Sequence, residues 1–142
     1  MVNLSKFRIL KYTYNVSNKD LDVFLWDKMS PSELKWATKL TMDGVNDTGE
    51  DDGKSWDIIL VEPKMVTMVD EVLNKYELKF DVEDLTQNLK YGVKFFSDEF
   101  MRKLDSFLDN ELDVDGILDR MLDEGVDSLT SLEKYYLDKN FR

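Results

Sequence analysis

The sequence contains no cysteine and no histidine, and only 2 prolines and 6 glycines among 142 residues. The lack of cysteine excludes disulfides, thiol nucleophiles and cysteine-based zinc or iron–sulfur sites. The lack of histidine removes the usual general base near neutral pH, so Ser-His-Asp and Cys-His catalysis are excluded. Any metal would be a hard cation held by oxygen, such as Mg²⁺ or Ca²⁺. No sequence motif specifies a catalytic residue, a metal ligand or a cofactor.

Long apolar runs are also lacking. The longest, Ile58-Ile59-Leu60-Val61, is far too short to span a membrane. The first ten residues have no extended apolar segment and no small-residue cleavage site, and Lys11 follows them directly. We therefore expect a cytoplasmic protein without a membrane partner.

The charge is abundant and mostly of one sign. The chain has 30 acidic and 19 basic residues, for a formal net charge of −11. Residues 1–42 carry 7 basic and 4 acidic groups, whereas 43–97 and 98–142 each carry 6 basic and 13 acidic groups. Because these acidic regions repel phosphates, we expect no direct nucleic-acid binding. The small basic set Lys6, Arg8, Lys11 and Lys19 is interpreted as a solvated edge.

Apolar patterning predicts an α+β fold with a small sheet, mostly antiparallel or mixed. The predicted strands cover residues 7–16, 56–61, 77–82 and 91–95. Two helices, 31–41 and 64–75, are expected to pack on this sheet. Ser30 to Glu33 forms a capping box ahead of the first helix, and Pro63 begins the second.

Two other segments of this region have weaker patterns. Residues 21–26 fit either a strand or a helix. Residues 43–55 contain three glycines and five acidic groups, and we expect a loop there. The tryptophans Trp26, Trp36 and Trp56 are expected in the core.

The last third of the chain is predicted to be helical. Ser97 is expected to cap a helix with the apolar stripe Phe100, Leu104, Phe107 and Leu108. A second stripe is expected at Val114, Ile117, Leu118, Met121 and Leu122, and Gly125 ends it. Thr130 to Glu133 forms a capping box for a last helix with Leu132, Tyr136, Leu137 and Phe141. We accordingly expect an α+β core over 1–96 and an acidic three-helix region over 97–142, packed as one domain.

Residues 112–142 resemble the short C-terminal helical hairpins called SHOCT-like. The resemblance rests on Leu118, Asp119, Gly125, Ser128, Leu129, Thr130, Glu133 and Leu137. It implies a module for oligomerisation or protein contact, so a homo-oligomer formed through the C-terminal helices is an open alternative.

Two patterns in the sequence partly match cation sites. Twelve-residue calcium loops built around Gly53 or Gly116 would place Ile59 or Leu122 where a glutamate is needed. Asp57 with Glu62-x-Lys64 resembles the carboxylate–lysine arrangement of metal-dependent nucleases, which would use Mg²⁺ to activate water.

Repeated aspartates carry the main functional hypothesis. Asp115, Asp119 and Asp123 recur every four residues opposite an apolar stripe, and Asp105 and Asp109 do so on the preceding helix. Like charges at this spacing destabilise a helix by about 0.2–0.5 kcal/mol per pair. A solvated helix face is the simplest interpretation, and a surface for a basic partner is the functional one.

The leading hypothesis is a non-enzymatic protein-binding module, regulator or inhibitor that uses this acidic surface. Its predicted partner-binding residues are Asp105, Asp109, Asp115, Asp119, Asp123, Glu124 and Tyr135. Tyr135 is included because Tyr135 and Tyr136 point about 100° apart on a helix, so one of them is expected to face outward. The alternatives are a nucleic-acid mimic, by analogy with small acidic inhibitors of phages and mobile elements, and a Mg²⁺-dependent carboxylate hydrolase or nuclease.

Overall fold

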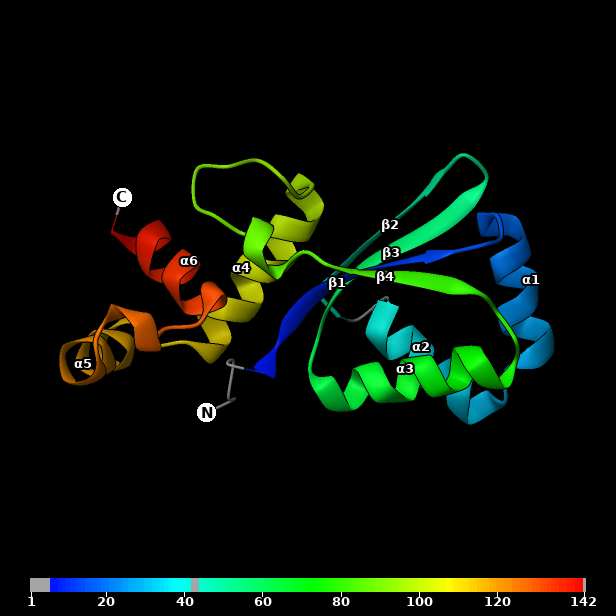
Figure 1. Cartoon of the computed structure of the whole chain (residues 1–142), viewed down its shortest axis with the longest axis horizontal. Coiled ribbons are helices and arrows are strands. Elements are labelled where there is room, and N and C mark those ends of the chain that lie inside the picture. The colour runs from blue at the N-terminus through cyan, green and yellow to red at the C-terminus, as the bar shows by residue number, and fades with distance from the viewer. Residues whose placement is uncertain (1–5, 42–43, 142) are drawn as a thin grey trace. The chain divides into compact units, whose positions relative to one another are not determined.

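The computed structural model describes residues 6–41 and 44–141, without the side chains of residue 36 and residues 38–41. In chain order the elements (Figure 1) are β1 (Arg8–Tyr14), α1 (Asn18–Lys28), α2 (Pro31–Thr41), β2 (Asn46–Asp51), β3 (Lys54–Val61), α3 (Pro63–Lys75), β4 (Phe80–Asp84), η2 (Thr86–Asn88), α4 (Asp98–Glu111), α5 (Val114–Glu124), η3 (Val126–Ser128) and α6 (Ser131–Asn140). The predicted α+β class is confirmed.

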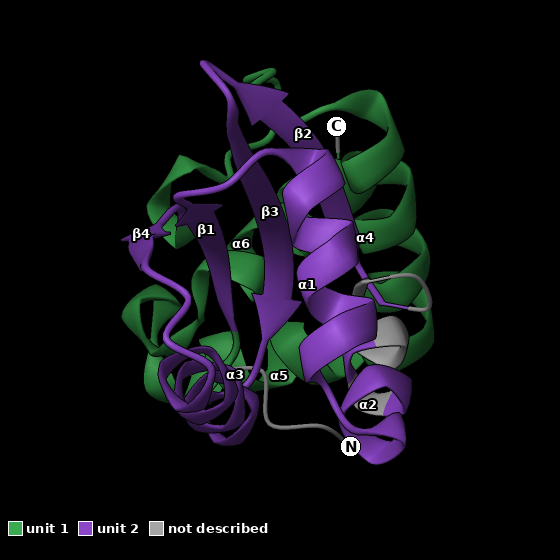
Figure 2. Ribbon diagram, turned by 90° about the vertical axis from the view of Figure 1, so that its right-hand side faces the viewer, with its two compact units in different colours: residues 1–7, 86–142 green, residues 8–85 purple. Residues whose placement is uncertain are grey.

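The chain divides into two compact units, coloured separately in Figure 2. Residues 8–85 form the sheet unit, and residues 1–7 and 86–142 form the helical unit. The predicted division fell at residue 96, whereas the structure groups 86–96 with the helices.

The sheet has the strand order β2-β3-β1-β4, and all its pairings are antiparallel. Alternate residues of the strands point to the face covered by helices. Tyr12, Tyr14, Ile59 and Val61 form a core on that face with Val69, Leu73 and other apolar residues. Side chains of α1 and α3 pack against this core, so residues 21–26, which fitted either structure, belong to a helix.

The prediction of a loop over residues 43–55 is wrong for most of its length. Residues 46–51 form β2, which pairs with β3 in a hairpin. Its turn contains Asp52 and Gly53 with φ values of +52° and +76°, the backbone that Asp-Gly favours in two-residue hairpin turns. β2 has mostly polar and acidic side chains, so its sequence lacks the apolar alternation of a strand. Backbone pairing with β3 holds it in place.

The predicted strand at 91–95 is also wrong. Gly92 has a φ of +82°, and the Val93 N–H donates to the Lys90 carbonyl at 3.2 Å, so the chain turns here. The fourth strand is β4, which begins three residues later than predicted. Glu77, with a φ of +59°, ends the turn after α3 and delays the strand.

The expected burial of the tryptophans fails in one case. Trp26 is 76% exposed on α1, a helix without a fully buried residue. Trp56 is half-buried, its ring lying against Gly49 with the Lys11 ammonium 5.2 Å from the ring centroid. The Trp36 side chain lies outside the part that the structure describes.

The three predicted helices of the helical unit are present, whereas Phe141, expected in the apolar set of the last one, is 63% exposed. Ser97 and Thr130 cap α4 and α6, and the Thr130–Glu133 capping box is present. Phe100, Leu104 and Leu108 of α4 are buried. None of the helices in the described chain is both long and apolar enough to cross a bilayer.

Candidate protein-binding surface

Helix α5 begins and ends where its local sequence requires. The Asp113 side chain accepts the Gly116 N–H at 3.2 Å and so satisfies one donor of the first turn. Gly125, with a φ of +87°, ends the helix, and its N–H donates to the Met121 carbonyl. Ile117 is buried and fixes which side of the helix faces inward.

The opposite side of α5 carries Asp115, Asp119 and Asp123, all exposed. Their four-residue spacing places them on one face, about 6 Å apart along the helix axis. Within the described ranges none of the three forms an ion pair. Their charges therefore face solvent without compensation.

Two exposed apolar residues lie in or directly after α5. Leu122 is 80% exposed and Val126, in η3, is 55% exposed. Leu122 is seven residues after Asp115, which is nearly two helical turns and places it on the aspartate face. Val126 follows Gly125, which ends the helix, so helical spacing does not place it on this face. The prediction that Leu122 joins the buried stripe is wrong, because it sits at the margin of that stripe. We call Asp115, Asp119, Leu122 and Asp123 the α5 outer face.

Arg120 does not neutralise this face, because it pairs with Glu133 of α6. Glu133 is buried. Burial raises the pKa of Glu133, but the hydrogen bonds from Arg120 and Thr130 outweigh it and hold the pKa below its usual value. Glu124 lies at the end of α5 near Arg120, whose pKa its charge helps to raise. Glu124 is thus exposed but outside the α5 outer face.

The remaining predicted site residues lie between α4 and α6, where Tyr135 is buried, Asp105 is half-buried and Asp109 is exposed. The Tyr135 hydroxyl donates to Asp105 Oδ1 at 2.7 Å. Lys139 Nζ lies 3.6 Å from Asp105 Oδ1 and 3.8 Å from Asp109 Oδ1. Burial, together with the Asp105 carboxylate, raises the pKa of Tyr135 well above its ordinary value.

The expectation that one of the two adjacent tyrosines faces outward is wrong, since Tyr135 and Tyr136 are each only 7% exposed. The hydrogen bond to Asp105 allows the Tyr135 hydroxyl to be buried. Asp105 and Tyr135 therefore stabilise the helical unit, whereas Asp109 is exposed and lies 3.8 Å from the Lys139 ammonium. Of the predicted aspartates, Asp115, Asp119 and Asp123 have no ion pair in the described structure, and Leu122, which the sequence had placed in the buried stripe, is exposed beside them.

The sheet unit contains a separate buried carboxyl. Asp57 Oδ2 accepts the Tyr14 hydroxyl at 3.0 Å, inside the sheet unit. Burial raises the pKa of Asp57 to about 6, against the opposing effect of this hydrogen bond. Glu62 and Lys64, its supposed nuclease partners, are exposed at the start of α3.

In the described part of the chain, no three or more carboxylates converge to hold a metal ion. Residues 48–59, tested as a calcium loop, form the β2–β3 hairpin instead. In comparisons with protein-family models, curated proteins and solved structures, nothing matches this chain.

Proposed function

We propose that this chain is a protein-binding module whose α5 outer face binds a basic partner. The observation that carries the proposal is Leu122, 80% exposed among aspartates that have no ion pair in the described structure. An apolar side chain surrounded by polar groups gains binding energy when a partner covers it and excludes water. Nearby carboxylates would select a partner with lysine or arginine around an apolar pocket.

The acidic charge also affects how fast such a partner arrives. A surface of one sign steers an oppositely charged molecule toward it, and salt weakens this attraction. Binding through Leu122 is apolar and depends less on salt. We therefore expect association to slow with added salt more than dissociation accelerates.

Nucleic-acid mimicry is the second candidate for the same face. The evenly spaced carboxylates of Asp115, Asp119 and Asp123 resemble a row of phosphates in charge. The duplex has a denser charge, about one per 1.7 Å of axis, and it presents no aliphatic side chain like Leu122 between its charges. The apolar Leu122 side chain favours a protein-specific surface, and competition with DNA or RNA for the captured partner separates the two.

The enzymatic alternative would gain support from several carboxylates that converge on Mg²⁺, and the described residues offer no group of three or more. The resemblance of residues 112–142 to SHOCT-like hairpins agrees with a contact role, since α5, η3 and α6 form a capped helix–turn–helix there.

Affinity capture with mass spectrometry tests the proposal. The wild-type chain should retain basic proteins from lysate of the source cells, and Leu122→Ala should retain at least about tenfold less of them, equivalent to roughly 1.4 kcal/mol. The control is Val23→Ala, which removes an exposed aliphatic side chain from α1. Equal retention by the wild type and Leu122→Ala would contradict the proposal.

A further inference from the structure

The free edge of β4 is a second interaction surface, on the sheet unit. β4 is the last strand in the order β2-β3-β1-β4, and Figure 2 shows it at the margin of the sheet. An edge strand presents unpaired backbone N–H and C=O groups that can pair with another extended chain.

The hydrogen bonds at the two ends of β4 show which backbone groups point outward. The Asn15 N–H donates to the Lys79 carbonyl at 3.1 Å, and the Leu85 N–H donates to the Ile9 carbonyl at 2.8 Å. In an antiparallel pair, bonded residues alternate with residues whose N–H and C=O face away. Asp81 and Glu83 therefore bond to β1, and the N–H and C=O of Phe80 and Val82 face outward.

The side chains along this edge define the chemistry of a complementary strand. Asp81 and Glu83 are exposed and lie on one face of the sheet, opposite Thr13 and Lys11 in register. On the other face Val82 is 45% exposed. A strand added to β4 would place basic residues beside the carboxylates and an apolar residue beside Val82.

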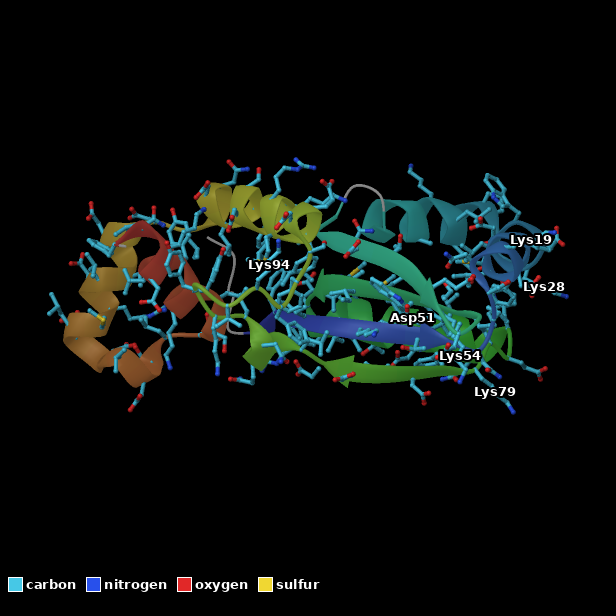
Figure 3. The ribbon with its side chains drawn as sticks, turned by 90° about the horizontal axis from the view of Figure 1, so that it is seen from above. Lys19, Lys28, Asp51, Lys54, Lys79 and Lys94 are labelled. Atoms are coloured by element: carbon cyan, nitrogen blue, oxygen red, sulfur yellow. The ribbon has the colours of Figure 1, made fainter. Side chains whose placement is uncertain are left out.

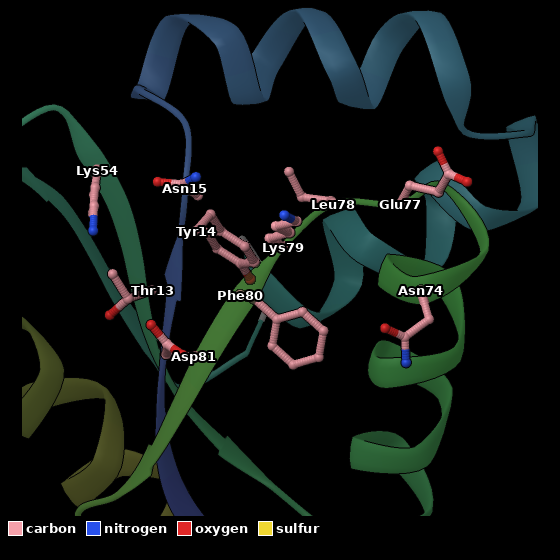
Figure 4. A pocket seen from close by; sticks show the side chains of 10 residues that line it. All are labelled: Thr13, Tyr14, Asn15, Lys54, Asn74, Glu77, Leu78, Lys79, Phe80 and Asp81. Atoms are coloured by element: carbon pink, nitrogen blue, oxygen red, sulfur yellow. The ribbon is translucent and has the colours of Figure 1, made fainter.

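A cavity lies at the beginning of β4. It has a volume of about 940 Å³ and is lined by Asn74, Leu78 and Phe80, among others. Figure 4 shows the Asn74 side chain of α3 directed toward Phe80 of β4. This space can receive a side chain that extends past Phe80 from an added strand, as pockets do in strand-addition complexes.

Charged residues of both signs line this cavity. Lys54 and Lys79 lie at the same end of the sheet unit (Figure 3), and Glu77 and Asp81 line the cavity with them. An antiparallel strand would place its basic residues beside Asp81 and Glu83 and its C-terminal end near this cavity.

A second copy of this chain does not fit this edge. Pairing of β4 with β4 would bring Asp81 and Glu83 close to carboxylates of the other copy, and like charges on paired strands are destabilising. The charges that prevent self-association leave the edge open to a basic segment.

We propose that the β4 edge binds an extended peptide segment with alternating basic and apolar residues, by antiparallel strand addition. The juxtaposition of outward backbone groups at Phe80 and Val82 with the exposed carboxylates of Asp81 and Glu83 carries this proposal. It does not depend on the α5 outer face.

The test uses fluorescein-Val-Lys-Val-Lys-Val-Ser-amide and fluorescence anisotropy at low ionic strength. In antiparallel addition the valines bond to Phe80 and Val82, whereas the N–H groups of the lysines point away. N-methylation of the last two valines should weaken binding at least about tenfold, which corresponds to roughly 1.4 kcal/mol. N-methylation of the two lysines should leave the affinity within about twofold, since it removes no inter-strand hydrogen bond.

Two protein variants complete the test. Val82→Pro removes an outward N–H without breaking a bond to β1, and an edge position tolerates proline. We expect at least about tenfold weaker binding, again roughly 1.4 kcal/mol. Asp81→Asn/Glu83→Gln should also weaken binding, whereas Asp115→Asn/Asp119→Asn/Asp123→Asn should not.

The methylated peptides keep the test decisive if Val82→Pro fails to fold, because they use the wild-type chain. Failure of the unmodified peptide to bind, or equal affinity of the two methylated peptides, would overturn strand addition. Loss of binding in the α5 variant alone would assign the peptide to the α5 outer face and overturn the β4 site.

Discussion

Helices α4 and α5 carry aspartates at the same four-residue spacing, but their carboxylates have different surroundings. Asp105 and Asp109 face α6, where Tyr135 and Lys139 contact them. Asp115, Asp119 and Asp123 face solvent, with Leu122 exposed beside them. The same sequence pattern thus yields a structural cluster on one helix and an unpaired acidic surface on the next. The following substitutions test this difference, from the largest expected effect to the smallest.

Removal of Tyr135 should cause the largest loss of stability. Tyr135→Ala deletes a buried ring and leaves Asp105 without its hydroxyl donor. We expect the free energy of unfolding to fall by about 3–5 kcal/mol, as for other large-to-small aromatic changes. Urea denaturation measures it, with Asp119→Asn as an exposed control expected within about 0.5 kcal/mol of the wild type. A change of similar size in both variants would contradict the assignment.

Because Asp57 is buried, its titration should lower the free energy of unfolding as the pH rises. The exposed aspartates should not have this effect. Its pKa is raised from 3.8 to about 6 in the folded chain. The folded state therefore binds the Asp57 proton more tightly than the unfolded state does. This stabilises the folded chain below about pH 4, and the stabilisation is lost as the pH rises through about 6. The effect is up to about 3 kcal/mol, since one pKa unit equals about 1.4 kcal/mol.

Asp57→Asn removes this titration. The difference in unfolding free energy between wild type and variant should change between about pH 4.5 and pH 7, in favour of the variant at the higher pH. Asp119→Asn, at an exposed position, is the matched control. A pH-independent difference for Asp57→Asn would show that this carboxyl is not held in its neutral form.

The two glutamates near Arg120 should contribute differently to the stability of the chain. Glu133→Ala removes half of the α6 capping box and the ion-pair partner of Arg120. We expect a loss of about 2 kcal/mol, from the lost cap and the unpaired buried charge. Glu124→Ala, at the exposed end of α5, should change stability by less than about 0.5 kcal/mol. Thermal and urea unfolding measure the loss of stability in each variant. Equal losses in Glu133→Ala and Glu124→Ala would contradict this prediction.

The smallest effects should have opposite signs on the two helices. Asp105→Asn should destabilise the chain by about 1 kcal/mol, because it weakens a charge-assisted hydrogen bond. Asp123→Asn should stabilise it by about 0.3–0.5 kcal/mol at low salt, because it relieves repulsion from Asp119 and from the helix C-terminus. Salt should abolish the second effect more readily than the first.

Local signals in the sequence predicted much of this fold. Capping groups such as Ser97 and the Thr130–Glu133 pair act within one turn, so the sequence shows them directly. The alternation in β1 and the apolar run in β3 likewise predicted two strands. β2 was not predicted, because its side chains are mostly polar and its backbone hydrogen bonds leave no mark on the sequence. Asp52-Gly53 is nevertheless a hairpin signal.

The candidate surface was only partly predictable for a different reason. The periodicity of the aspartates indicated their faces but not the elements that those faces meet. Asp105 and Tyr135 are 30 residues apart, and only the tertiary fold joins them. Leu122 lies at the margin of an apolar stripe, where small rotations of the helix decide between burial and exposure.

The most direct test of the central claim compares two sets of three neutralised carboxylates. Asp115→Asn/Asp119→Asn/Asp123→Asn alters the α5 outer face, and Asp22→Asn/Asp27→Asn/Glu71→Gln makes the same charge change on exposed positions of α1 and α3. Captured proteins from source-cell lysate are quantified for both variants and the wild type. We predict that basic proteins bound by the wild type and by the α1–α3 variant are lost from the α5 variant. Equal loss from both variants, or retention by both, would contradict a specific acidic binding face on α5.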